Sequence, residues 1–247
     1  MKRLLTALAM FAFARQGHAE TVSVAVAANF TAPMQKIAAL FQQDTGHQAI
    51  LSLGSTGRLY AQIKNGAPFE VLLAADDETP AKLEQEGLGV KGSRFTYAVG
   101  QLVLWSPQAG MVDAQGQVLK TGRFNKIALA DPKLAPYGMA ALETMTQLGV
   151  LESLRPHWVL GENIAQTYQF VSTGNAQLGF VALSQVRADG RIGQGSAWVI
   201  PEQLHTPIRQ DALLLRQGQA KPAALALLQY LQSDKALAII RASGYTR

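Results

Sequence analysis

The sequence predicts an α/β protein with largely parallel sheets, arranged as two lobes. Strand-like and helix-like segments alternate from residue 20 to the C-terminus, which is typical of sheets whose strands are joined through helices. The 247-residue chain is long for a single sheet, yet no Pro-rich or Gly/Ser-rich linker divides it. We therefore expect two lobes joined by strands that cross from one to the other.

Hydrophobic periodicity places the individual elements. Short apolar runs predict strands at residues 22–27, 49–53, 70–74, 101–105, 126–130, 157–160, 178–181, 197–200 and 210–215. Apolar residues at helical spacing predict helices at residues 33–44, 58–64, 80–86, 138–148, 165–172, 220–232 and 234–242. The stretch 110–122 is rich in Gly, Gln and Asp and is predicted to be a surface loop.

Two of these strands run straight into a cluster of small hydrogen-bonding residues that opens a helix. The cluster after the first strand is Ala-Asn-Phe-Thr at residues 28–31. The cluster after the second strand is Gly-Ser-Thr-Gly at residues 54–57. The start of a helix leaves backbone N–H groups without partners and carries the positive end of the macrodipole. Two such starts at one sheet edge predict an anion site.

The residue types indicate how that anion would be held. Asn29, Ser55 and Thr56 are neutral donors, and neither cluster contains a Lys or Arg before Arg58. Such a site holds a small dianion by geometry and dipoles without neutralising it. The alternative is that these three residues are ordinary helix caps, which is the commonest role of their types.

Several further segments carry a family resemblance. They are residues 26–31, 54–63, 65–71, 74–76, 97–106, 135–138 and 178–182. Together they resemble the periplasmic molybdate-binding proteins of ABC importers, over essentially the whole chain after the first twenty residues. The combination is specific, although no single segment is.

The resemblance implies a class II periplasmic-binding-protein fold, with two lobes of mostly parallel sheets and a ligand cleft between them. Lobe 1 would then be discontinuous and comprise residues 20–97 plus 188–247, and lobe 2 would comprise residues 98–187. Open α/β sheets bind ligands at the carboxyl ends of their strands. We therefore expect Ala28, Asn29, Ser55 and Thr56 to form one wall of the cleft.

The opposite wall is expected from lobe 2. In the family, loops there donate backbone N–H groups and a tyrosine hydroxyl completes the shell, which implies roles for Tyr137 and for the Ile164 N–H. Many members carry that tyrosine after the Gly-Phe-Val strand, where this chain has Ala182. This chain instead matches a branch with Ala-Pro-Tyr-Gly, here residues 135–138. The alternative for Tyr137 is a packed surface aromatic.

The function that the resemblance implies is binding of molybdate and tungstate in the periplasm and delivery to the permease and ATPase of an ABC importer. No cofactor and no direct metal ligand are expected, since molybdenum would be held as its oxyanion, and a monomer is expected. Sulfate is also a fully ionised tetrahedral dianion, so a receptor for sulfate or another such oxyanion remains an alternative. Phosphate keeps a proton below about pH 7 and would favour an acceptor carboxylate.

Catalysis is the more remote alternative, as a hydrolase that uses Ser55. Residues 54–57 do not form the Gly-x-Ser-x-Gly elbow of hydrolases, and the four histidines show no metal-ligand spacing. Asp76 and Asp77 are adjacent carboxylates, yet Asp at a strand end is usually a cap or a turn former. No phosphate-binding glycine loop is present.

The first 19 residues resemble a cleaved signal peptide. Lys2 and Arg3 precede an apolar stretch, and Gly-His-Ala at residues 17–19 is a small-residue cleavage pattern. Removal of this segment, which also contains Arg15, lowers the formal charge from +5 to +2. No basic stripe remains that would favour nucleic acid. Cysteine is absent, so disulfides and thiolate metal sites are excluded.

Overall fold

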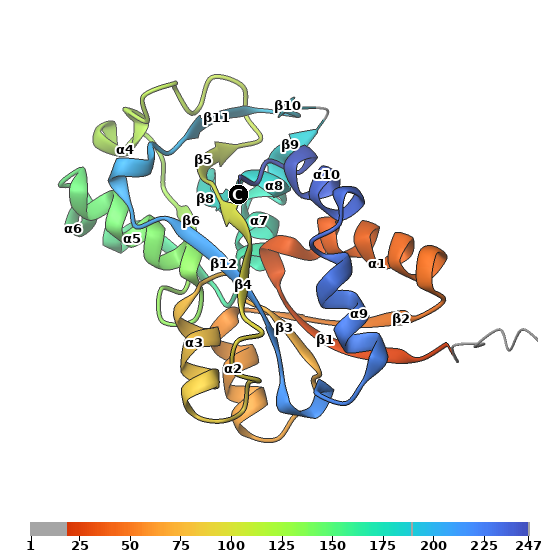
Figure 1. Ribbon diagram of the computed structural model, residues 1–247. Helices are drawn as coiled ribbons and strands as arrows, with labels where there is room; N and C mark the ends of the chain where they lie inside the picture. The colour runs from red at the N-terminus through yellow and green to blue at the C-terminus, as the bar shows by residue number, and fades with distance from the viewer. Residues whose placement is uncertain (1–18, 189, 247) are drawn as a thin grey trace, which may run out of the picture.

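The computed structural model describes residues 19–188 and 190–246 and contains two five-stranded sheets, each with helices packed against it (Figure 1). The predicted signal peptide therefore lies outside the described residues, apart from Ala19. Within the described part of the chain, every helix is too short or too polar to cross a bilayer.

The first sheet has the strand order β2-β1-β3-β12-β4. Its strands are β1 (Thr21–Ala27), β2 (Gln48–Gly54), β3 (Val71–Leu73), β4 (Phe95–Gly100) and β12 (Ile208–Leu214). The helices of this lobe are α1 (Thr31–Thr45), α2 (Thr56–Lys64), α3 (Glu78–Gln85), α9 (Pro222–Tyr230) and α10 (Asp234–Ala242). A one-turn 3-10 helix, η1 (Ala28–Phe30), joins β1 to α1.

The second sheet has the order β11-β5-β8-β6-β7. Its strands are β5 (Leu102–Ser106), β6 (Ile127–Ala130), β7 (Trp158–Gly161), β8 (Leu178–Ala182) and β11 (Ser196–Val199). The helices of this lobe are α4 (Val118–Thr121), α5 (Pro136–Gln147), α6 (Leu151–Leu154), α7 (Ile164–Ser172) and α8 (Leu183–Val186). A short hairpin of β9 (Arg187–Ala188) and β10 (Arg191–Ile192) follows α8.

The first strand shows why the apolar runs of this sequence form central strands. Val22, Val24 and Val26 are fully buried in one hydrophobic cluster with α1, whereas Ala25 is buried in another with Leu59 of α2. A strand covered on both faces needs a nearly continuous apolar run. β1 pairs in parallel with both β2 and β3, which brings the carboxyl ends of β1 and β2 to one sheet edge.

Both sheets are mixed, because strands pass between the lobes. β1 pairs in parallel with its neighbours, as does β6 with β7 and β8, whereas β12 and β5 pair in antiparallel fashion with theirs. The chain leaves the first sheet at the end of β4 and enters the second at β5, with only Gln101 between them. It returns between β11 and β12.

The return to the first lobe occurs later in the sequence than the predicted boundary at residue 188. β11 (Ser196–Val199) pairs with β5 along its whole length, so this segment belongs to the second sheet. A second difference is β4, which is absent from the predicted strands although Phe95, Tyr97 and Val99 alternate with smaller residues. The predicted loop 110–122 also contains the single turn α4.

Candidate functional site

A small cavity lies between the lobes where five strand-to-helix connections meet. Its volume is about 10 Å³ for the centre of a water-sized sphere, which corresponds to about one water molecule. Its lining is Ala27, Ala28, Asn29, Gly54, Ser55, Thr56, Ala75, Ala135, Pro136, Tyr137, Asn163 and Ile164. All six residues predicted for the oxyanion site are in this set.

Ser55 is the side chain in this cavity with an unused polar group. It occupies the N-cap position of α2, but its side chain makes no cap hydrogen bond. The residue is 3% exposed, and its Oγ has no hydrogen-bond partner among the described residues. A buried hydroxyl without a partner costs about 1 to 3 kcal/mol, and this hydroxyl does not cap the helix that it precedes.

Thr56 supplies a second hydroxyl to the same wall. Its Oγ1 accepts a hydrogen bond of 3.0 Å from the Ala75 N–H, which fixes the side chain next to the end of β3. The hydroxyl proton then remains available for an acceptor in the cavity. Thr56 is also the first residue of α2, where backbone N–H groups lack partners within the helix.

Tyr137 is the lining residue of the second lobe whose side chain carries a hydroxyl. It follows Pro136 in the first turn of α5, and its phenol is buried. Burial raises the pKa of this phenol well above its ordinary value, so it carries its proton at neutral pH. The helix start lies tight against β6: a Cβ on Gly138 would be 2.2 Å from the Ala130 carbonyl oxygen. Glycine is therefore required next to Tyr137.

Ile164 begins α7 and contributes its backbone. The preceding Asn163 accepts hydrogen bonds from the N–H groups of Ala165 and Gln166, both at 3.0 Å. The Asn163 side chain does not bond the Ile164 N–H. This first N–H of the helix is therefore available at the cavity. The side chain of Ile164 is 3% exposed and anchors the turn in the core of the second lobe.

Asn29 lines the cavity, but its side chain has a different role from the predicted one. Its Nδ2 donates to Gln210 Oε1 at 2.8 Å and to Tyr245 Oη at 3.0 Å, which uses both amide protons within the protein. The amide therefore builds the wall of the cavity rather than facing into it as a donor. What Asn29 and the adjacent Ala28 offer a ligand is the backbone of the helix start.

Direct contacts hold the two walls together. The Gly57 N–H at the start of α2 donates to the Leu134 carbonyl before α5, at 2.9 Å. Arg58 forms an ion pair with Glu162, which precedes α7. Each contact joins an element of the first lobe to one of the second, so the cavity is closed off by both lobes together.

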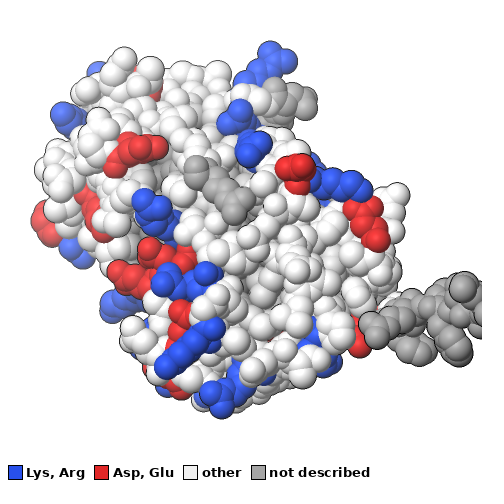
Figure 2. Space-filling view, in the orientation of Figure 1, with Lys and Arg blue, Asp and Glu red and all other residues white. Residues whose placement is uncertain are grey.

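The cavity is electrically neutral apart from its dipoles. None of the residues that line it carries a charge. Ordinary surface charges lie elsewhere: Figure 2 shows acidic and basic side chains intermixed where α3 and α5 approach each other. A neutral set of hydroxyl and N–H donors suits an anion that has no protons of its own to donate.

A larger groove of about 310 Å³ borders the cavity between α3 and α5. Asp76 lies in its wall, where its carboxylate accepts hydrogen bonds from the Thr79 N–H at 2.9 Å and the Thr79 hydroxyl at 3.1 Å. Asp76 is therefore a turn former at the start of α3. Burial is the largest effect on this carboxyl and raises its pKa to about 6.

We expect Asp76→Asn to stabilise the protein at neutral pH but not in acid. The carboxyl pKa is about 6 in the folded protein and 3.8 ordinarily. Its contribution to stability is therefore favourable below about pH 4 and is lost as the pH rises through about 6. Urea unfolding should show a gain of about 1 to 3 kcal/mol at about pH 7.5 that vanishes near pH 4. An equal gain at both pH values would contradict this account.

The described residues do not assemble a hydrolase around Ser55. His47 accepts from the Glu20 N–H, and the His157 and His205 rings bond to backbone carbonyls at Asn125 and Thr206. None of these rings lines the cavity. Within residues 19–188 and 190–246, no group of three or more His, Cys, Asp or Glu side chains is placed to hold a metal ion.

The fold and the cavity define a two-lobed binding protein, and comparison with known proteins agrees. Residues 22–246 match the model of the family described as bacterial extracellular solute-binding protein. The chain is 56% identical over 245 residues to the molybdate-binding protein ModA of Azotobacter vinelandii, covering 99% of this chain and 97% of that protein. It is 52% identical over 241 residues to ModA of Rhodobacter capsulatus, covering 97% and 94%.

A solved structure shows the same architecture. The periplasmic molybdate-binding protein of Azotobacter vinelandii superposes with a TM-score of 0.89 at 40% identity, covering 92% of this chain and 99% of that one. This chain belongs to the family of bacterial extracellular solute-binding proteins.

Proposed function

We propose that this protein binds molybdate, and also tungstate, in the periplasm and delivers it to the permease and ATPase of an ABC importer. The oxyanion is cargo, and the proposal includes neither catalysis nor a resident cofactor. The relatives named as molybdate-binding proteins support this function over nearly the whole chain. The observation that carries it for this chain is the Ser55 hydroxyl, buried in the cavity without a partner.

The donor set supports a fully ionised dianion. Ser55, Thr56 and Tyr137 each have a hydroxyl proton to offer, and the Ile164 N–H adds a backbone donor. Molybdate and tungstate can only accept hydrogen bonds at neutral pH, so a set of donors matches them. An anion that kept a proton would need an acceptor, and no carboxylate lines the cavity.

The site draws on both lobes, which supports its use in transport. Ser55 and Thr56 come from the start of α2, whereas Tyr137 and Ile164 begin α5 and α7. A bound ion would therefore stabilise the contact between the lobes, and an importer that recognises the joined lobes would distinguish loaded from empty protein. The basic and apolar start of the sequence supports export to the periplasm.

Calorimetry with four anions tests the proposal. The purified protein without residues 1–19 should bind molybdate and tungstate tightly, and sulfate and phosphate at least about a hundredfold more weakly, which corresponds to about 2.7 kcal/mol. The physical reason is that donors spaced for the larger ions would leave sulfate with hydrogen bonds too long on one side. Sulfate affinity equal to that of molybdate would establish a sulfate receptor instead.

A further inference from the structure

One buried amide links the binding residues of the two lobes. Gln210 lies on β12 and is fully buried. Its Oε1 accepts from Asn29 Nδ2 at 2.8 Å and from the Tyr97 hydroxyl at 3.0 Å, and its Nε2 donates to the Tyr137 hydroxyl at 3.2 Å. Asn29 belongs to the first lobe and Tyr137 to the second. Gln210 does not line the cavity, so any effect that it has on a ligand must pass through these neighbours.

The hydrogen bond from Gln210 determines what the Tyr137 hydroxyl can do. A phenol has one proton to donate and can also accept. When Gln210 Nε2 donates to the phenol oxygen, the phenol proton is left for another partner, for which the neighbouring Tyr245 hydroxyl and a bound ligand would compete. A bound dianion can only accept, so the two groups fit on opposite sides of the same hydroxyl. If the amide were turned around, its oxygen would compete with the ligand for that proton.

The surrounding backbone is shaped to allow this contact. A Cβ on Gly100 would lie 2.1 Å from the Tyr137 hydroxyl oxygen and 2.5 Å from Gln210 Nε2. The last residue of β4 therefore leaves the space in which the two polar groups meet. The pairing of β12 with β4 shifts register between Gln210 and Asp211, at the same place.

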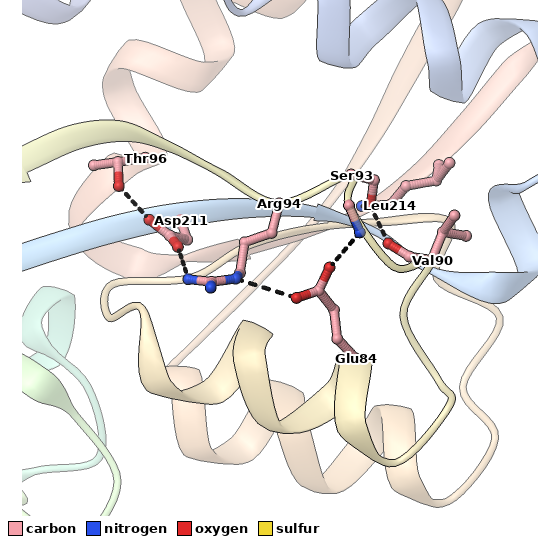
Figure 3. Close-up of polar contacts among 8 residues, drawn as sticks. Glu84, Val90, Ser93, Arg94, Thr96, Asp211 and Leu214 are labelled. Carbon is pink, nitrogen blue, oxygen red and sulfur yellow. Dashed lines mark hydrogen bonds and ion pairs between the residues drawn. The ribbon is translucent and has the colours of Figure 1, made fainter.

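Asp211, the residue after Gln210, anchors strand β12. Asp211 accepts from Arg94 Nη1 at 2.7 Å and from the Thr96 hydroxyl at 2.6 Å, and Arg94 also reaches Glu84 of α3 (Figure 3). Asp211 is 2% exposed. These bonds tie β12 to β4 and to α3, so the Gln210 backbone is held in place independently of any ligand.

We propose that Gln210 is a positioning residue that orients the Tyr137 hydroxyl proton toward the bound oxyanion. The inference rests on the proposed function and adds a residue outside the cavity to the binding machinery. Gln210 donates its amide N–H to the phenol oxygen and accepts from Asn29 through its amide oxygen. The Tyr137 hydroxyl therefore acts as an acceptor toward Gln210 and as a donor on its other side. The part of its effect that passes through Tyr137 therefore requires the Tyr137 hydroxyl, whereas any part that passes through Asn29 does not.

A double-mutant cycle tests this dependence. Gln210→Met keeps much of the side-chain volume and removes both polar groups, and it should weaken molybdate binding about three- to tenfold by calorimetry. In the Tyr137→Phe background, where no hydroxyl remains to be oriented, the same substitution should change affinity less than about twofold. Equal losses in both backgrounds would overturn the proposal, because they would show that Gln210 acts through packing or through Asn29 and not through the Tyr137 hydroxyl. Absence of molybdate binding by the unmodified protein would instead refute the proposed function.

A second variant adds a readout that packing alone would not change. Gln210→Glu keeps the shape of the side chain, but its ionised carboxylate can only accept hydrogen bonds. It would therefore accept the hydrogen bond that the Tyr137 hydroxyl otherwise donates to the ligand. We expect its molybdate affinity, relative to that of the unmodified protein, to fall as the pH rises from about 6 to about 8.5. A constant ratio over this range would overturn the proposal. This variant also serves if Gln210→Met fails to fold.

Discussion

Gly100→Ala should weaken molybdate binding more than any single loss of a hydroxyl, by at least about a hundredfold. The added Cβ would lie 2.1 Å from the Tyr137 hydroxyl oxygen, which is far inside contact distance. The phenol must therefore move out of its position, which removes one charge-assisted hydrogen bond worth about 1.5 to 3 kcal/mol. Overpacking adds about 1 to 3 kcal/mol of strain at the junction of the lobes.

Gly110→Ala is a matched control for this substitution. Gly110 has φ of +73° and nothing within 4 Å of the position of an added Cβ. Alanine there should lower the unfolding temperature slightly, because this φ is unfavourable for a residue with a side chain, yet molybdate affinity should not change. If Gly100→Ala bound molybdate as well as the control does, the Tyr137 hydroxyl would not contribute to the site.

Tyr137→Phe should weaken molybdate binding roughly ten- to a hundredfold, or about 1.5 to 3 kcal/mol, without abolishing it. The phenol is protonated at neutral pH and its proton is directed by Gln210, so the substitution removes one donor to the anion. The ring and the backbone of α5 remain in place. Calorimetry at neutral pH measures the loss.

Ser55→Ala provides the comparison for Tyr137→Phe. It removes a hydroxyl that has no partner within the described protein, so it should weaken binding by a similar factor while leaving or raising the stability of the unliganded protein. Tyr137→Phe also removes an acceptor from Gln210 and should slightly lower that stability. Unchanged affinity for Tyr137→Phe beside a clear loss for Ser55→Ala would show that the second lobe supplies no hydroxyl.

The elements that form the cavity were accessible from the sequence, because each combines a strong strand signal with a helix start. The apolar run at residues 22–28 and the Gly-Ser-Thr-Gly at 54–57 lead directly into α1 and α2, as predicted. Ser55, Thr56, Tyr137 and Ile164 reach one cavity because the sheets bring the carboxyl ends of their strands together. Their roles as ligands stay a prediction.

The features that the sequence did not disclose depend on long-range pairing. The role of the Asn29 amide is determined by Gln210 and Tyr245, which are 181 and 216 residues away in the chain. Gln210 lies between Arg209 and Asp211 in the polar first half of β12, where a glutamine carries no motif, and its burial follows only from the tertiary structure. The late return to the first lobe likewise follows from the pairing of β11 with β5.

A crystal structure of the protein grown with molybdate, with anomalous diffraction from molybdenum, tests the central claim most directly. The account predicts one strong molybdenum peak in the cavity between α2, α5 and α7. The Ser55 and Tyr137 hydroxyl oxygens should each lie about 2.5 to 2.9 Å from a molybdate oxygen. A peak in the neighbouring groove beside Asp76, or a bound ion that leaves Ser55 Oγ without a partner, would contradict the account.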